Sequence, residues 1–150
     1  MVDTRTTMDD CSISKTINMN KIFTEDALQK AFDQTVEMHE KFRTVVGKKV
    51  NCDDPKDIVN HMTELTEVMA TGVTAKARFQ MLTEKLSFKK MMNLNNDDMG
   101  ATERKIIIAY EIGDCSFYNG LCEMLIKEAH YKMDMLRSAL SYSKSEMNIL

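Results

Sequence analysis

Two acidic residues, Glu111 and Asp114, stand in the most apolar part of the chain. They belong to the segment Ile106 to Cys122, IIIAYEIGDCSFYNGLC, which carries no other charge. On a helix, a spacing of three residues puts both carboxylates on the same face. A helix that is apolar on nearly all sides is typical of the interior of a bundle, where unpaired charges are costly. We therefore expect a compensating group beside this pair.

A second acidic pair with the same spacing, Glu64 and Glu67, lies in the segment MTELTEVMA. If the two helices pack antiparallel, the four carboxylates converge between them. Neither segment contains Lys or Arg, so a hard divalent cation, Mg²⁺ or Mn²⁺, suits this set of oxygen ligands better than a side-chain partner does.

Acidic pairs at this spacing also occur on solvated helix faces, and that is the ordinary interpretation of most of them. The apolar surroundings of Glu111 and Asp114 favour the metal site over this interpretation. Two further pairs fit the solvated case: Glu37 with Glu40, and Asp54 with Asp57.

The segments around both pairs resemble a known family. Thr63 to Ala70, TELTEVMA, resembles the E-x-x-E helix of the all-α nucleoside triphosphate pyrophosphohydrolases, the superfamily of MazG, dimeric dUTPase and phosphoribosyl-ATP pyrophosphatase. Glu111 to Tyr118, EIGDCSFY, resembles the second helix of that family, E-x-x-D. Phe32 to Phe42, FDQTVEMHEKF, resembles its leading helix. The resemblance extends over roughly residues 27–144.

The resemblance implies an activity and a site. Members of the family hydrolyse nucleoside triphosphates between the α and β phosphates and release a nucleoside monophosphate and pyrophosphate. Mg²⁺, or Mn²⁺, would orient the phosphates and activate a water, and one carboxylate would take the proton of that water. Members associate as dimers or tetramers to complete the site. The implied metal ligands and catalytic residues are Glu64, Glu67, Glu111 and Asp114.

Binding of phosphate also requires cationic or polar donors. Each cation among the candidates equally fits a solvated surface, and Tyr118 fits a core position whose hydroxyl finds a partner better than it fits substrate binding. The candidates for substrate binding are Arg78, Tyr118, Asn119, Lys127, Lys132, Arg137 and Lys144.

Length and composition determine which architecture must position these residues. The chain has 150 residues with only 5 Gly and 1 Pro, too few turn residues for a sandwich or barrel of many short strands. We predict one all-α domain, residues 23–150, after a polar N-terminal arm, residues 1–22. The expected architecture is a bundle of four to five helices in which an antiparallel central hairpin carries the two acidic motifs.

Local signals predict where the helices begin and end. Thr24 is the expected N-cap of a first helix that stops near Gly47, and Asp54 with Pro55 starts the next. Gly72 is a candidate for a kink or an end of that helix. After a loop at 93–98, a helix is expected from Thr102 through Ile126 or beyond. Glu128 to Met147 is also expected to be helical, either continuous with it or after a bend.

Charge and cysteine usage exclude several classes of partner. The net charge of −3 gives no global attraction to nucleic acid, and the longest apolar run is far shorter than a bilayer requires. The four cysteines form no C-x-x-C pair, which favours reduced thiols in a cytoplasmic protein. The alternative to a homo-oligomeric enzyme is a non-enzymatic helical oligomer, such as a viral structural or assembly component.

Overall fold

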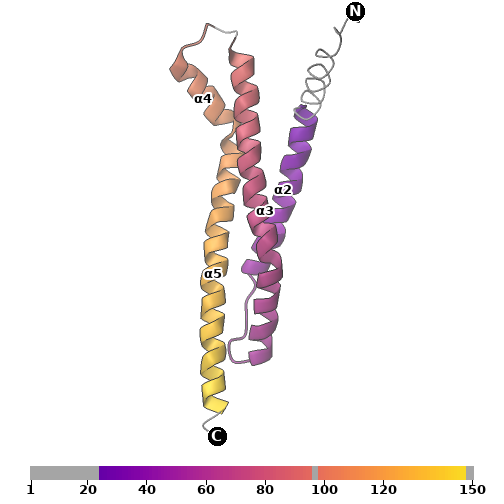
Figure 1. The fold of residues 1–150 in the computed structure, drawn as a ribbon, viewed down its shortest axis with the longest axis vertical. Coiled ribbons are helices and arrows are strands. Elements are labelled where there is room, and N and C mark those ends of the chain that lie inside the picture. The colour runs from indigo at the N-terminus through magenta and orange to yellow at the C-terminus, as the bar shows by residue number, and fades with distance from the viewer. Residues whose placement is uncertain (1–23, 96–97, 148–150) are drawn as a thin grey trace, which may run out of the picture.

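The computed structural model describes residues 24–95 and 98–147, so the expected arm at residues 1–22 and Cys11 lie outside the described residues. Within the described ranges the chain forms four α-helices and no strand (Figure 1). The prediction of an all-α bundle is confirmed. The helices are α2 (Glu25–Val46), α3 (Pro55–Leu94), α4 (Ala101–Glu111) and α5 (Gly113–Met147).

The ends of α2 and the start of α3 lie where local chemistry predicts. Thr24 is the N-cap of α2, and the helix gives way at Gly47. Asp54 caps α3 by accepting a hydrogen bond from the Lys56 N–H at 2.9 Å, and Pro55 occupies the first turn. Proline is favoured there because the first amides of a helix have no intrahelical acceptor.

The helix α3 runs unbroken through Gly72, so the expected kink or end at this glycine is wrong. A Cβ at Gly72 would lie 2.5 Å from two ring carbons of Phe42, which is fully buried on α2. The missing side chain therefore makes room for the Phe42 ring. Buried residues recur along α3 at intervals of three, four and seven, the seam of a coiled coil: Ile58, His61, Leu65, Gly72, Ala75, Phe79 and Leu82.

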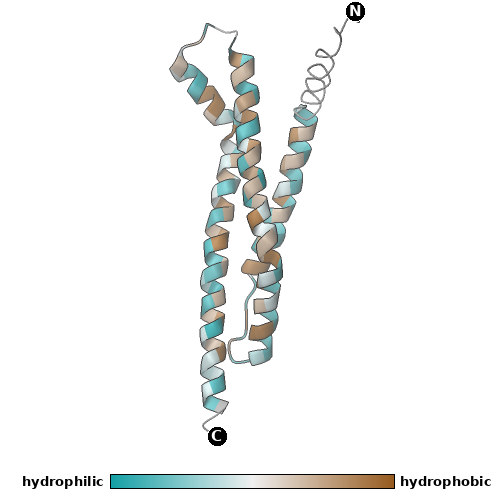
Figure 2. Ribbon diagram, in the orientation of Figure 1, coloured by the Kyte–Doolittle hydropathy of each residue, from teal (hydrophilic) through white to brown (hydrophobic). Residues whose placement is uncertain are grey.

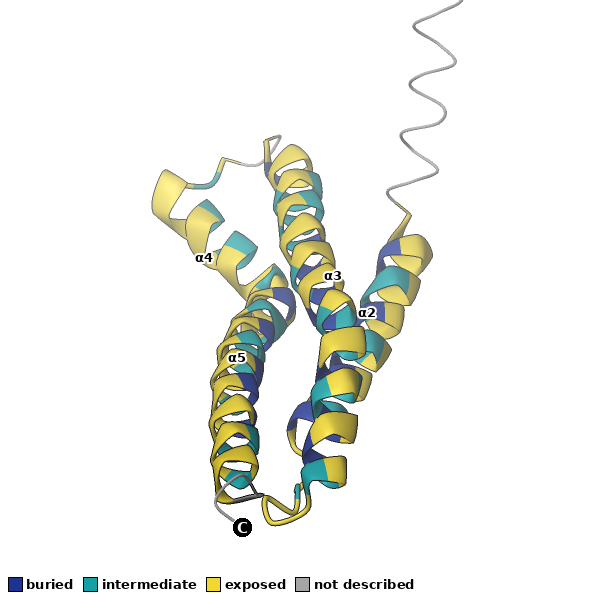
Figure 3. Ribbon diagram, turned by 60° about the horizontal axis from the view of Figure 1, so that its bottom comes forward, coloured by how far each residue is buried: buried dark blue, intermediate teal, exposed yellow. Residues whose placement is uncertain are grey.

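The expected helix from Thr102 to Ile126 is divided at Ile112. Within α4 no residue is buried, whereas α5 packs along α3. Figure 3 shows the same contrast, because dark blue buried positions line the facing sides of α2, α3 and α5 and are missing from α4. The first part of the apolar segment therefore contacts α3 without becoming buried.

The central helix α3 runs antiparallel to both α2 and α5 (Figure 1). Apolar and polar residues are mixed along each helix (Figure 2), and the apolar ones that face inward form two core clusters. The first lies around Phe42, Ile58 and Leu136, and the second around Phe79, Cys115 and Cys122. In the second cluster, the Phe79 ring stacks on Tyr118 with centroids 5.2 Å apart.

The three cysteines among the described residues are free thiols. Cys115 and Cys122 are buried on the inner face of α5, and burial raises the pKa of each thiol to about 11. A thiol with such a pKa is protonated at neutral pH and behaves as a small apolar side chain. None of the described helices has the length and apolar character that crossing a membrane requires.

Candidate functional site

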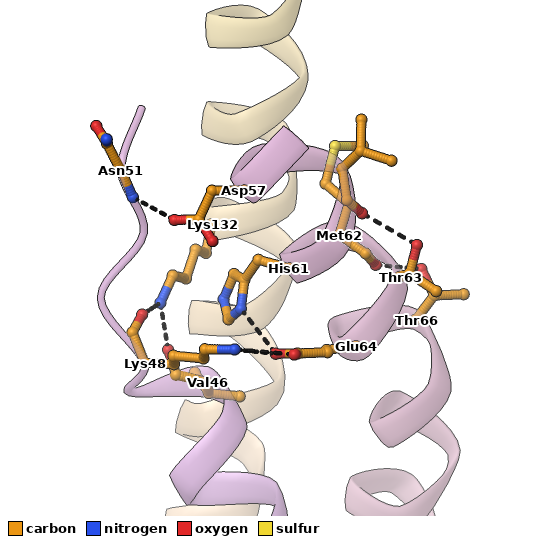
Figure 4. Close-up of polar contacts among 11 residues, drawn as sticks. Val46, Lys48, Asn51, Asp57, His61, Met62, Thr63, Glu64, Thr66 and Lys132 are labelled. Atoms are coloured by element: carbon orange, nitrogen blue, oxygen red, sulfur yellow. Dashed lines mark hydrogen bonds and ion pairs between the residues drawn. The ribbon is translucent and has the colours of Figure 1, made fainter. Parts of the chain in front are cut away.

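Glu64, from the first expected acidic pair, is engaged in a local polar network. Its two carboxylate oxygens accept hydrogen bonds from Lys48 Nζ at 2.8 and 2.9 Å, and Oε2 lies 3.4 Å from Nδ1 of His61 (Figure 4). The hydrogen bond from Lys48 holds the pKa of Glu64 below its usual value. Glu67, one turn further along α3, is exposed. The Lys48 ammonium therefore compensates Glu64 without a metal ion.

Lys132, a candidate phosphate donor, instead holds the backbone at the end of α2. Its ammonium donates to the carbonyl oxygen of Val46 at 2.6 Å and to that of Lys48 (Figure 4). Val46 is the last residue of α2 and Lys48 lies just beyond it, where carbonyl acceptors lack intrahelical partners. Burial lowers the pKa of Lys132. We call Lys48, His61, Glu64 and Lys132 the polar network, and it ties α2, α3 and α5 together.

His61 makes the stability of the folded chain sensitive to acid. Its side chain is buried, and this burial, followed by the nearby Lys132 charge, lowers the pKa of the imidazole below 6.5. In the unfolded chain His61 takes up a proton near pH 6.5, so the unfolded state binds more protons below that value. The contribution of neutral His61 to the free energy of unfolding is therefore complete above about pH 7. It is lost as the pH falls through 6.5 towards the pKa of His61 in the folded chain.

We accordingly expect the melting temperature of the wild type to fall on acidification from pH 7.5 to 5, and to fall less in His61→Gln, which cannot be protonated. Glu64 adds little slope in this interval, because the usual pKa of a Glu side chain lies below pH 5 and the folded pKa of Glu64 is lower still. Thermal unfolding followed by circular dichroism measures the difference. An equal fall of the melting temperature with pH in both proteins would contradict the role of His61 in acid sensitivity.

The second acidic pair is exposed rather than buried, which corrects the expectation for the segment Ile106 to Cys122. Glu111 ends α4 and Asp114 lies in the first turn of α5, and both side chains reach solvent. Glu111 Oε2 lies 3.3 Å from Lys90 Nζ. Glu111 and Asp114 line a pocket of about 200 Å³ between α2, α3 and α5. Its other lining residues are Glu25, Gln29 and Lys89 and the apolar Leu28, Phe32, Leu82, Leu86 and Cys115.

The structure does not bring the two acidic pairs together within one chain. Glu111 contacts Lys90, which lies 26 residues beyond Glu64 on α3 (90 − 64). That interval corresponds to about 39 Å along a helix. Among residues 24–95 and 98–147, no group of three or more His, Cys, Asp or Glu side chains could hold a metal ion. The four carboxylates do not converge as expected, because the packing of the long helices α3 and α5 places the two acidic pairs far apart along the bundle.

The remaining candidates for substrate binding are spread along two helices. Tyr118 packs against Phe32, Phe79 and His39 in the core, which is the structural role already considered for it. Beside it, Asn119 Oδ1 is buried without a hydrogen-bond partner. The cations do not converge: Lys127 pairs with Glu123, Arg137 pairs with Asp134, and Arg78 and Lys144 are exposed.

A row of exposed apolar side chains on α5 was missed by the sequence reasoning. The outer row comprises Phe117, Met124, Tyr131, Met135 and Tyr142, each between 46% and 76% exposed. At 100° per residue, these five positions lie within about 40° of one another around the helix. The available signal was their spacing of seven, seven, four and seven residues, hidden by the assumption that this helix is buried on all sides.

The outer row borders a second hollow. The hollow has a volume of about 460 Å³ and lies between α5 and the segment that follows α2. Its lining combines the apolar Val46, Val50, Tyr131 and Met135 with Gly47, Lys48, Lys49, Glu128 and Lys132. The part of the row at Tyr131 and Met135 therefore borders a concave surface.

No protein-family model, curated protein or solved structure matches the chain. The comparisons supply no family assignment, so the function has to be argued from the described residues.

Proposed function

We propose that the chain is a non-catalytic helical assembly protein, which acts by associating with other polypeptide chains through the outer row of α5. The observation that carries the proposal is the row itself. Single exposed apolar side chains are ordinary on protein surfaces, but a contiguous apolar patch is typical of an interaction site. The row runs from Phe117 to Tyr142, 25 residues (142 − 117) or about 37 Å of helix.

The composition of the row supports association with protein rather than with a small molecule. Its members are aromatic residues and methionines, which are enriched in the centres of protein interfaces. Methionine side chains adapt their shape to a partner. Only Tyr131 and Met135 of the row line the hollow beside it, and the row as a whole extends along a helix surface, whereas small-molecule sites are concave.

The polar groups of the expected enzyme also fit a structural role. Glu64 is neutralised by Lys48, Glu111 lies beside Lys90, and Lys132 holds the end of α2. Each of these groups has a partner within the chain, so none of them requires a substrate or a metal to compensate its charge.

The proposal is tested by placing charges in the row. We expect Met124→Glu with Tyr131→Glu to weaken self-association or partner binding by at least about 100-fold, because two carboxylates would have to be desolvated in the interface. Helix content should change little, and so should the melting temperature when both proteins are compared at a concentration at which they are monomeric, since both side chains are exposed. Sedimentation velocity over a concentration series and circular dichroism measure the two effects. Thr66→Glu with Arg78→Glu, at exposed positions of α3, is the matched control.

Association that is unchanged in the row variant would overturn the proposal. A loss of helix content equal to the loss of association would also overturn it, because the row would then be part of the folded core rather than an interaction surface.

A Mg²⁺-dependent nucleotide pyrophosphohydrolase is the second candidate, favoured by one observation. Glu111 and Asp114 lie side by side at a pocket that also contains Lys89. In this candidate the two carboxylates would bind Mg²⁺, and Glu64 and Glu67 would have to come from another copy of the chain. The protein would then be an oligomeric enzyme whose site forms only on assembly.

Metal addition and a substrate panel separate the two candidates. For the assembly protein we expect 5 mM MgCl₂ to shift the melting temperature no more than a matched concentration of salt, and no pyrophosphate to be released from canonical (deoxy)nucleoside triphosphates. Stabilisation by Mg²⁺ that Glu111→Gln abolishes, together with pyrophosphate release, would favour the enzyme, because a ligand of the folded state raises its stability.

A further inference from the structure

We propose that the outer row binds a second copy of this chain, with the two α5 helices antiparallel about a two-fold axis that passes between Ala129 and His130. This inference rests on the proposed function and specifies the partner. Three independent features of α5 support it: the symmetry of the row, the order of the charges beside it, and the area that it exposes.

The outer row is nearly palindromic. Phe117 and Tyr142 lie at equal distances on either side of the midpoint between Ala129 and His130, and so do Met124 and Met135. An antiparallel pair centred there therefore stacks aromatic against aromatic and methionine against methionine. A two-fold interface uses the same patch on both subunits, so its patch must be complementary to itself in this way.

The centre of the row adds a polar pair with the same symmetry. Glu128 and Tyr131 lie at equal distances from the midpoint, and Glu128 lies beside the row, about one turn before Tyr131 and about two turns before Met135. In the antiparallel pair each Tyr131 lies beside the Glu128 of the second copy. The phenol hydroxyl can then donate to the carboxylate, which satisfies the only charge that the interface would cover along the row.

Charges beside the row select this alignment. Lys127 and Asp134 lie on the same side of the row, and antiparallel helices bring the same flanks together. With the axis between Ala129 and His130, Lys127 of each copy faces Asp134 of the other. Moving the axis by half a heptad towards the N-terminus would instead bring the two Lys127 side chains together, which is repulsive.

Both charged side chains are available for this contact. Within the chain, Lys127 pairs with Glu123 and Asp134 pairs with Arg137, but Lys127 and Asp134 are each 74% exposed. Exposed pairs of this kind are weak and exchange easily with other partners.

The exposed area is sufficient for a dimer. The five side chains of the outer row present roughly 700 Å² per chain, judged from their exposed fractions and the 150–250 Å² that an aromatic side chain covers. A standard interface buries about 800 Å² per partner. The flanking Lys127 and Asp134 add a polar rim, and Glu128 adds area at the centre.

Charge reversal tests the alignment in the full chain. We expect Lys127→Glu and Asp134→Lys to weaken the dimer by about tenfold each, because two attractive pairs become repulsive, and the double variant K127E/D134K to return to within about threefold of the wild type. Sedimentation equilibrium measures the mass against the 17.2 kDa of one chain. Lys41→Glu, on the exposed side of α2, is the matched control and should leave the dimer unchanged.

Disulfide trapping tests the orientation. In a Cys11→Ser/Cys52→Ser background, Met124→Cys with Met135→Cys should form a covalent dimer on mild oxidation, because position 124 of one copy faces position 135 of the other. Within one chain the two positions are 11 residues apart (135 − 124), about 16 Å along the helix and too far for a disulfide. The single variant Met124→Cys should remain uncrosslinked.

The outcomes separate this inference from the proposed function. Ready crosslinking of the single variant Met124→Cys would overturn the antiparallel alignment and indicate a parallel pair. A wild type that assembles and is sensitive to Met124→Glu, but not to the charge reversals, would overturn the alignment while leaving the assembly function intact. A wild type that is monomeric at about 100 μM would overturn the second copy as the partner. Binding of another protein that Met124→Glu with Tyr131→Glu abolishes would then still support the assembly function.

Discussion

Gly72→Ala is expected to lower the free energy of unfolding by about 2–3 kcal/mol, although the same change at an exposed helical site raises it by about 0.5–1 kcal/mol. The new Cβ would lie 2.5 Å from Cδ1 and Cε1 of Phe42 and 2.8 Å from Cζ. The Phe42 ring is fully buried, so it cannot move aside without displacing other core residues. Urea denaturation followed by circular dichroism measures the change.

The matched control is Gly120→Ala on the exposed side of α5, where an added Cβ meets nothing within 4 Å. It should stabilise the chain by about 0.5–1 kcal/mol, measured at low protein concentration. A second control removes the obstacle: Phe42→Ala alone should cost about 3–5 kcal/mol, and adding Gly72→Ala to it should recover part of that loss. Gly72→Ala that stabilises the wild type would show that the two helices pack less closely than described.

Phe79→Ala should lower the free energy of unfolding by about 3–5 kcal/mol, the same range as Phe42→Ala. The Phe79 ring is fully buried, stacks on Tyr118 with centroids 5.2 Å apart and meets the edge of Phe32 at 5.8 Å. The Phe79 ring therefore contacts side chains of α2 and α5 from its place on α3. Its loss leaves a cavity that the three helices cannot fill by moving closer together.

Met81→Ala, two residues further along α3, is the control for Phe79→Ala. Its side chain is 44% exposed, so we expect a change below about 1 kcal/mol. Chemical denaturation of both variants measures the contrast. Similar losses in the two proteins would mean that the second core cluster is not organised around Phe79.

The helix boundaries could be predicted because they depend on neighbouring residues. Asp54 accepts the Lys56 N–H two residues away, Pro55 needs no hydrogen-bond partner in the first turn, and Gly47 follows the last turn of α2. The role of Gly72 was not predicted because the residue that requires a glycine there, Phe42, lies 30 residues away in the sequence (72 − 42). From the sequence alone, a glycine within a helix indicates a kink or an end; the packing of the neighbouring helix shows whether it instead makes room for a side chain.

The candidate site was harder to predict than the fold. The segment around Glu111 looks buried because it is apolar, but burial requires a neighbouring helix, and no residue of α4 is buried against one. Glu64 looked unpaired because its own segment carries no cation, whereas Lys48 reaches it from the segment before α3. Apolar composition and local charge cannot reveal either fact, since both depend on elements distant in the sequence.

The sequence by itself determined the helical class, the two ends of α2 and the start of α3, because turn residues and caps act over one or two turns of the chain. Only the tertiary structure decided which carboxylates meet and which apolar face stays uncovered. Those features follow from the alignment of α3 against α2 and α5, which places Glu64 and Glu111 far apart along α3. The same alignment leaves the outer row on the side of α5 that no other helix covers among residues 24–95 and 98–147.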